Sequence, residues 1–221
     1  MILEPRFAAE VVDACAAAIV VLGVLLAMTR SIGRSIWIVA VQSVFVGLAA
    51  VAVGLATGVG HLAVGGLMAI GAKGFVVPLV LGTILRRSSV RQERRPMLGT
   101  RVTLVVAVAI VFAATAAAAD VAPGSVVSVS RALPAAISQV LTGLLLVMTR
   151  RKAISLVIGL LVFENGIALT AFSLTYGMPL VVELGVLFDL LIAIVVAWIY
   201  ARRMLDVFGS TSTDELQSLR G

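Results

Sequence analysis

The chain has 221 residues, of which 61% are hydrophobic and 13% are charged, and its mean hydropathy is +1.17. This composition excludes a soluble globular domain and predicts a protein whose surplus apolar surface is solvated by lipid. We attribute the formal net charge of +6 to short basic loops beside membrane spans rather than to nucleic-acid binding, because such loops determine topology and contact anionic lipids.

Seven segments are long and apolar enough to be spanning helices, which need about 20 residues because lipid offers no partner to free backbone groups. In chain order they are 8–29, 35–57, 62–85, 102–120, 134–149, 153–176 and 179–201. The fifth is the weakest, because it is short and begins at Pro134. Glu4, Glu10 and Asp13 replace the basic residues of a signal peptide, so we expect the first span to stay attached. The expected fold class is all-α, a polytopic membrane protein with about seven transmembrane helices.

Basic residues cluster in alternate connections between these segments, whereas the other connections contain only Arg6 and Arg131. The positive-inside rule then predicts an N-terminus outside and a C-terminus in the cytoplasm (N-out/C-in), in a multi-pass protein of the cytoplasmic membrane. The clusters are Arg30 and Arg34; Arg86, Arg87, Arg91, Arg94, Arg95 and Arg101; Arg150, Arg151 and Lys152; and Arg202 and Arg203.

The longest polar connection, 86–101, divides three predicted helices from four. We therefore expect an N-terminal three-helix membrane segment with a basic cytoplasmic loop over 1–101. A C-terminal four-helix membrane segment is expected over 102–203, followed by a cytoplasmic tail over 204–221.

The chain contains one cysteine, Cys15, and one histidine, His61. These numbers exclude disulfides, iron–sulfur clusters, thiolate zinc sites and a haem held by two histidines within the chain. We interpret His61 as an interfacial residue. No cofactor or metal is expected in this chain, so any redox chemistry would belong to partner proteins.

Three ionisable residues are predicted near the middle of the bilayer, where a charge costs about 2.5–3.5 kcal/mol and usually has a functional reason. Counting about 1.5 Å per residue from the span ends places Lys73, Glu164 and Asp189 at this depth. The short connection 176–179 makes the last two spans antiparallel neighbours. We therefore expect Glu164 and Asp189 to face each other, share an exchangeable proton, and form a proton relay with Lys73.

The surroundings of Lys73 are also expected to be polar. Pro78 cannot donate a hydrogen bond to the carbonyl of Gly74, so we expect a kink and a polar pocket beside the ammonium group. Gln42 and Gln139 are intramembrane as well. They either donate to the charged groups or connect helices, and we prefer the second interpretation.

Glu183 and Asp13 are predicted to lie nearer the outer surface and are weaker candidates for the relay. A static function is the alternative for the deeper groups. An ion pair between Lys73 and a buried acid can fix helix packing without moving any proton.

Residues 161–169 have the sequence LVFENGIAL, and the helix predicted after them contains Glu183 and Asp189. These features resemble the hydrogenase-4 component E family, membrane subunits of complex I-like group 4 hydrogenases. This resemblance covers nearly the whole chain in length, span count and the Glu-Asn-Gly motif at 164–166. The last three predicted helices, 134–203, also resemble the small K subunit of bacterial complex I and its counterpart in Mrp antiporters.

The resemblance implies an accessory, non-catalytic subunit in contact with antiporter-like membrane subunits and a hydrogenase module. Nickel–iron and iron–sulfur centres would lie in those partners. In the K-like subunits, an acid in each of the second and third helices belongs to the polar axis that carries protons. By position Glu164 matches the first acid and Asp189 best matches the second, although an aspartate is one methylene shorter and Glu183 competes for the assignment.

We expect Asn165, Gln139 and Gln42 to support these groups in the translocation of protons or sodium ions. Two other functions stay open on the sequence alone. One is a structural membrane adaptor whose buried ion pairs are static. The other is an autonomous secondary transporter, which would favour an internal repeat with broken helices in both halves.

Overall fold

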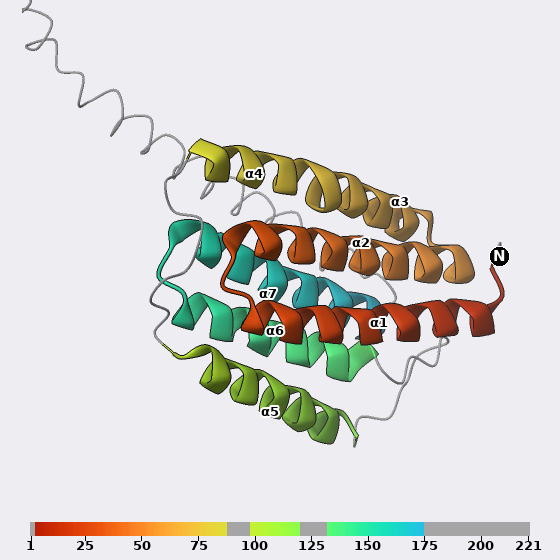
Figure 1. Ribbon diagram of the computed structural model, residues 1–221. Helices are drawn as coiled ribbons and strands as arrows, with labels where there is room; N and C mark the ends of the chain where they lie inside the picture. Colours follow the sequence, from red (N-terminus) through yellow and green to blue (C-terminus); the bar gives the residue numbers. More distant parts are fainter. Residues whose placement is uncertain (1–2, 88–97, 120–131, 175–221) are drawn as a thin grey trace, which may run out of the picture.

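The described residues of the computed structural model are 3–87, 98–119 and 132–174. They form helices joined by short connections, and no strand occurs among them. The helices are α1 (Pro5–Met28), α2 (Ile32–Thr57), α3 (Gly60–Ala69), the π-helical segment η1 (Ile70–Val76), α4 (Val77–Arg87), α5 (Thr100–Ala118), α6 (Ala132–Thr149) and α7 (Ala153–Leu174) (Figure 1).

Within these ranges, six stretches are long and apolar enough to cross a membrane, since α3, η1 and α4 continue one another over Gly60–Arg86. The first six predicted spans each coincide with one stretch. Their largest end error is three residues, at the start of α1, where Pro5 occupies the first turn that proline tolerates. The all-α prediction is confirmed for the described part of the chain. The seventh predicted span, 179–201, and the tail 204–221 lie outside the described residues.

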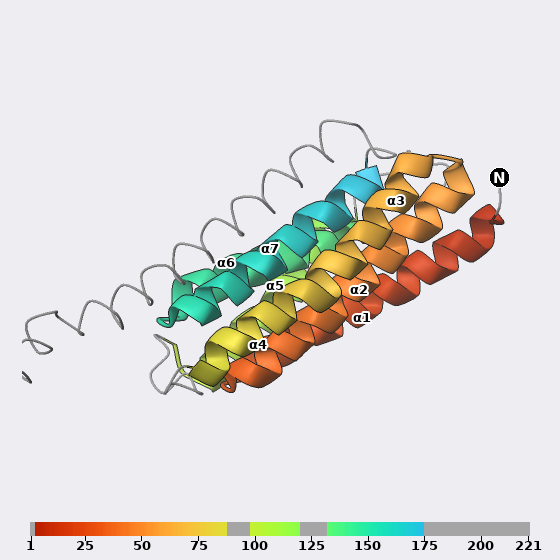
Figure 2. The same cartoon turned by 90° about the horizontal axis from the view of Figure 1, so that it is seen from above.

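Helices α2 and α7 occupy the centre of the bundle. Helix α2 packs against α1, α3, η1, α4 and α7, while α6 packs against α7, α1 and α5. The helices lie side by side along one common direction, with the rod of α3, η1 and α4 on one side of the bundle and α5 on the other (Figures 1 and 2). A side chain on α7 can therefore reach the rod, α2 or α6, depending on the direction in which it points.

Close helix contacts in the bundle depend on glycine. A methyl group on Gly143 of α6 would collide with the backbone of Phe163 in α7. Gly47 of α2 and Gly66 of α3 face each other in the same way, each within 2.7 Å of the other's carbonyl oxygen when a Cβ is added. Since lipid gives no hydrophobic force between apolar helices, such close approach supplies much of the packing energy.

Replacing Gly143 with alanine should therefore destabilise the protein by about 1–3 kcal/mol, the usual cost of overpacking. Thermal unfolding in detergent measures this loss. Gly65→Ala is the matched control, because nothing lies within 4 Å of a Cβ at that helical position. If both substitutions lowered the unfolding temperature equally, close packing at Gly143 would not be the cause.

One end of the bundle is strongly basic. The ends of α1, α4 and α6 and the starts of α2, α5 and α7 meet there (Figure 1). The Arg150 guanidinium donates hydrogen bonds to the carbonyls of Leu26 (3.2 Å) and Thr29 (2.9 Å), so it satisfies acceptors that the end of α1 leaves open. The basic residues at this end include Arg30, Arg34, Arg86, Arg101, Arg150, Arg151 and Lys152.

Candidate functional site: a buried ion pair and an amide network

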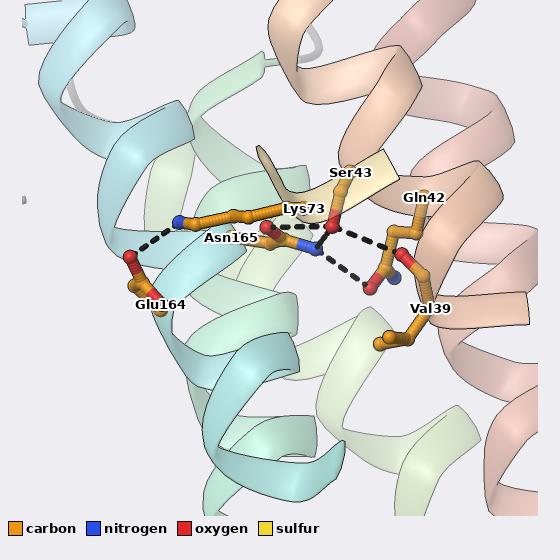
Figure 3. Close-up of polar contacts among 6 residues, drawn as sticks. All are labelled: Val39, Gln42, Ser43, Lys73, Glu164 and Asn165. Carbon is orange, nitrogen blue, oxygen red and sulfur yellow. Dashed lines mark hydrogen bonds and ion pairs between the residues drawn. The ribbon is translucent and has the colours of Figure 1, made fainter. Parts of the chain in front are cut away.

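An ion pair between Lys73 of η1 and Glu164 of α7 connects the rod to the central helix. The Lys73 ammonium donates a hydrogen bond to Oε1 of Glu164, and the two side chains form a salt bridge (Figure 3). Both residues are buried, with 7% of Lys73 and 2% of Glu164 exposed. Because each charge neutralises the other, the pair reduces the cost of holding either one inside the bundle.

Both residues lie near the middle of their spans. Lys73 is 13 residues from each end of the Gly60–Arg86 span (73 − 60 = 86 − 73 = 13). Glu164 is 11 residues after Ala153 and 10 residues before Leu174, the limits of α7 (164 − 153 = 11; 174 − 164 = 10). The depth expected from the sequence therefore agrees with the helix boundaries, and the pair lies where ionisable groups are most costly.

Lys73 belongs to the only π-helical segment of the described residues, Ile70–Val76. The backbone N–H of Val77 bonds to the carbonyl of Ala72, five residues earlier, and the following residue, Pro78, has no N–H to donate. We expected a kink before Pro78, and the structure has a widened helical turn at this place. Single π-turns inside α-helices occur frequently at functional sites.

A network of buried amides joins three helices at a neighbouring position. Nε2 of Gln42 in α2 donates to Oε1 of Gln139 in α6 at 2.9 Å and to the carbonyl oxygen of Ile19 in α1 at 3.2 Å. Nε2 of Gln139 donates to the same Ile19 carbonyl at 2.8 Å. The two glutamines therefore connect helices, in agreement with the interpretation preferred from the sequence.

Asn165 extends this network to α7. Its Nδ2 donates to Oγ of Ser43 at 3.0 Å and to Oε1 of Gln42 at 3.3 Å (Figure 3). The Ser43 hydroxyl also lies 3.0 Å from the Val39 carbonyl and 3.3 Å from Oδ1 of Asn165, and its single proton can serve one of them at a time. Since Asn165 follows Glu164 directly, one turn of α7 holds both the ion pair and the network.

The amino-acid sequence itself is 33% identical over 159 residues to the uncharacterised protein Rv0085 of Mycobacterium tuberculosis, a match that covers 70% of this chain and 71% of that protein. The chain belongs to the family of this mycobacterial protein. It is also 25% identical over 149 residues to hydrogenase-4 component E of Escherichia coli and of Shigella flexneri, with 67% of this chain and 69% of those proteins covered. No family model and no solved structure matches.

The family is thus distantly similar to hydrogenase-4 component E, as the Glu-Asn-Gly motif indicates. Two candidates from the sequence, Asp189 and Glu183, lie outside the described residues. The predicted meeting of Glu164 with Asp189 accordingly stays a prediction, and the contact of Glu164 that the structure defines is the one with Lys73. Among the described residues, no group of three or more histidine, cysteine, aspartate or glutamate side chains could hold a metal ion.

Sequence reasoning missed two residues of the site in this family member. Ser43 links Asn165 to α2, and a methyl group on Gly23 would collide with the Gln139 amide that reaches Ile19 across α1. An isolated serine or glycine in an apolar helix carries no signal for such a function, because small residues are frequent throughout membrane helices. Only their position beside two intramembrane glutamines distinguishes them.

Proposed function

We propose that this chain is an accessory, non-catalytic membrane subunit of a complex I-like assembly related to group 4 hydrogenases, and that it helps to move protons through the membrane. The observation that carries the proposal is the buried Lys73–Glu164 ion pair at mid-span. The distant similarity to hydrogenase-4 component E supports a subunit of such an assembly. Antiporter-like subunits and a hydrogenase module are the proposed partners.

The chemistry of the pair explains how it would respond to a proton. The hydrogen bond between Lys73 and Glu164 lies on the path along which a proton could pass between nitrogen and oxygen. A further proton on the carboxylate would leave a neutral acid beside an ammonium, and this unbalanced charge is costly in a poorly solvated site. The added proton is therefore favoured to move on to another acceptor.

Asp189 is our candidate for that acceptor, with Glu183 as the competing one, because both belong to the span predicted to follow α7. Gln42, Gln139 and Asn165 hold α1, α2, α6 and α7 together beside the pair. They are proposed to fix the distance between Glu164 and its neighbours. Protons are the coupling ion in this proposal.

The proposed topology is N-out/C-in in the cytoplasmic membrane, with seven spans. Its support is the collection of Arg30, Arg34, Arg86, Arg101 and the 150–152 cluster at one end of the bundle (Figure 1). Glu4 and Glu10 belong to the opposite end, at the start of α1. This asymmetry is the pattern that the positive-inside rule describes.

Purification from native membranes tests the proposed assembly. A tagged chain, extracted in mild detergent, should retain antiporter-like subunits and proteins with iron–sulfur centres, identified by mass spectrometry. An unrelated multi-span protein of the same membrane, tagged in the same way, is the control. A chain that purifies alone and transports ions by itself in vesicles would contradict the proposal and indicate a secondary transporter.

A structural adaptor is the second candidate, and a specific observation favours it. Lys73 and Glu164 neutralise each other, while the amide network joins α1, α2, α6 and α7. Such contacts can serve only to fix helix register. The two candidates differ in what happens when the pair is removed as a unit, a test described in the Discussion.

A further inference from the structure

An apolar groove lies between α1 and α5. Its walls are four α1 side chains from the stretch 20–25 and Val108, Val111 and Phe112 of α5. All of these side chains are valine, leucine or phenylalanine, and 70% of Phe112 is exposed. In a membrane-spanning bundle this surface faces lipid or a neighbouring molecule.

The groove points toward the basic end of the bundle. Arg101 precedes Phe112 by 11 residues, a separation of about 1100° at about 100° per residue, so the two lie within about 20° of one helix face. Thr100 has the same relation to Val111. Nε of Arg30, just beyond the end of α1, donates to Oγ1 of Thr100 at 2.5 Å. Two arginines thus lie at the mouth of the groove, one from each wall.

No acidic side chain of the described ranges accompanies these arginines. The acids described there are Glu4, Glu10 and Asp13 in or beside the first half of α1, and Glu164 at mid-span of α7. Arg30 and Arg101 are both exposed. Basic pockets between membrane helices on this side typically attract anionic lipid headgroups.

We propose that the groove and its two arginines bind one anionic phospholipid. An acyl chain lies between α1 and α5, and the phosphate contacts the guanidinium groups of Arg30 and Arg101. The glycerol unit joins the two parts, so one molecule satisfies both the apolar groove and the basic mouth. This inference is independent of the proposed proton transfer.

The shape of the groove favours a lipid over a transmembrane helix of a partner. Helices associate closely in membranes through glycine, alanine, serine and threonine, which let the backbones approach. None of these residues lines the groove. Bulky, uneven walls suit a flexible acyl chain, which can adapt its shape to them.

Native mass spectrometry of the purified full chain tests the proposal. After delipidation, the chain is titrated with phosphatidylglycerol or phosphatidylcholine in mixed micelles. One molecule of phosphatidylglycerol should bind in preference to phosphatidylcholine. Arg30→Gln and Arg101→Gln should each weaken binding about fivefold, because one basic residue near the membrane surface contributes about 1 kcal/mol to anionic lipid binding.

Two further variants separate the groove from general attraction. Arg86→Gln removes the same charge at the same end, but α4 lies on the side of the bundle opposite α5, so binding should not change (Figure 1). Val24→Trp fills the groove without changing charge and should weaken binding. Thermal unfolding checks that each variant is folded, and the arginine variants suffice if Val24→Trp is not.

Three results would overturn the proposal. Equal weakening by Arg86→Gln and Arg30→Gln would mean diffuse attraction to the whole basic end. Equal binding of phosphatidylcholine would remove the requirement for an anionic headgroup. Loss of the lipid from the wild-type chain on assembly, with a partner helix cross-linked to Val108, would make the groove a protein interface.

Discussion

Glu164→Gln is expected to leave the protein folded and assembled while proton translocation falls to the level of passive leak. Glutamine has nearly the shape of glutamate, and its amide oxygen can still accept a hydrogen bond from the ammonium of Lys73. It cannot take up and release a proton at physiological pH. The loss should therefore appear in translocation per assembled complex, measured in membrane vesicles with a pH-sensitive dye.

Glu10→Gln is the control for this experiment. Glu10 is exposed near the start of α1, far from mid-span, so its replacement should leave translocation unchanged. Normal translocation by the assembled Glu164→Gln complex would show that Glu164 carries no proton. A fall caused equally by Glu10→Gln would point to a general effect of removing negative charge.

Removing both charges of the ion pair is expected to separate stability from function. Lys73→Met or Glu164→Leu alone leaves a buried charge without its opposite, which typically costs about 3–5 kcal/mol. The double variant removes both charges and should recover most of that stability, since apolar residues of similar size often replace buried pairs without loss. Thermal unfolding in detergent of all four proteins gives the coupling between the two sites.

The double variant also distinguishes the two candidate functions. If the pair moves protons, the stable double variant assembles and does not translocate. If the pair only fixes packing, translocation recovers together with stability. Recovery of both would therefore reject a proton-carrying function for Lys73 and Glu164 and favour the structural adaptor.

The membrane spans were predictable because lipid requires long apolar runs with satisfied backbones, and this requirement can be seen in the sequence itself. For example, the span expected over 62–85 corresponds to the stretch Gly60–Arg86. The depth of Lys73 and Glu164 followed from the same counting. The seventh span and the orientation stay predictions, because the described residues end at 174.

The partners of the buried groups were harder to predict. Which side chain meets Lys73 depends on how the rod and α7 are rotated about their own axes, and packing determines that rotation. Glu164 and Asn165 are adjacent in the sequence, but about 100° separates them around the helix. One therefore meets η1 and the other meets α2. Sequence reasoning placed the acid toward Asp189 and did not pair it with Lys73 alone.

The π-turn was only partly foreseeable. Pro78 indicates that the helix hydrogen bonds are interrupted near Gly74, which led us to expect a kink. A proline does not determine whether the backbone responds by bending or by adding a residue to one turn. The structure shows the second response at Ile70–Val76, and this turn carries Lys73.

The most direct test of the account is whether Glu164 changes its protonation during turnover. Infrared difference spectra of the assembled complex, recorded as its redox reaction is started, report the carbonyl stretch of a protonated carboxylic acid. We expect such a band to appear in the wild type and to be absent in Glu164→Gln. An identical band in both proteins, or none in the wild type, would contradict the proposal that this buried acid carries a proton.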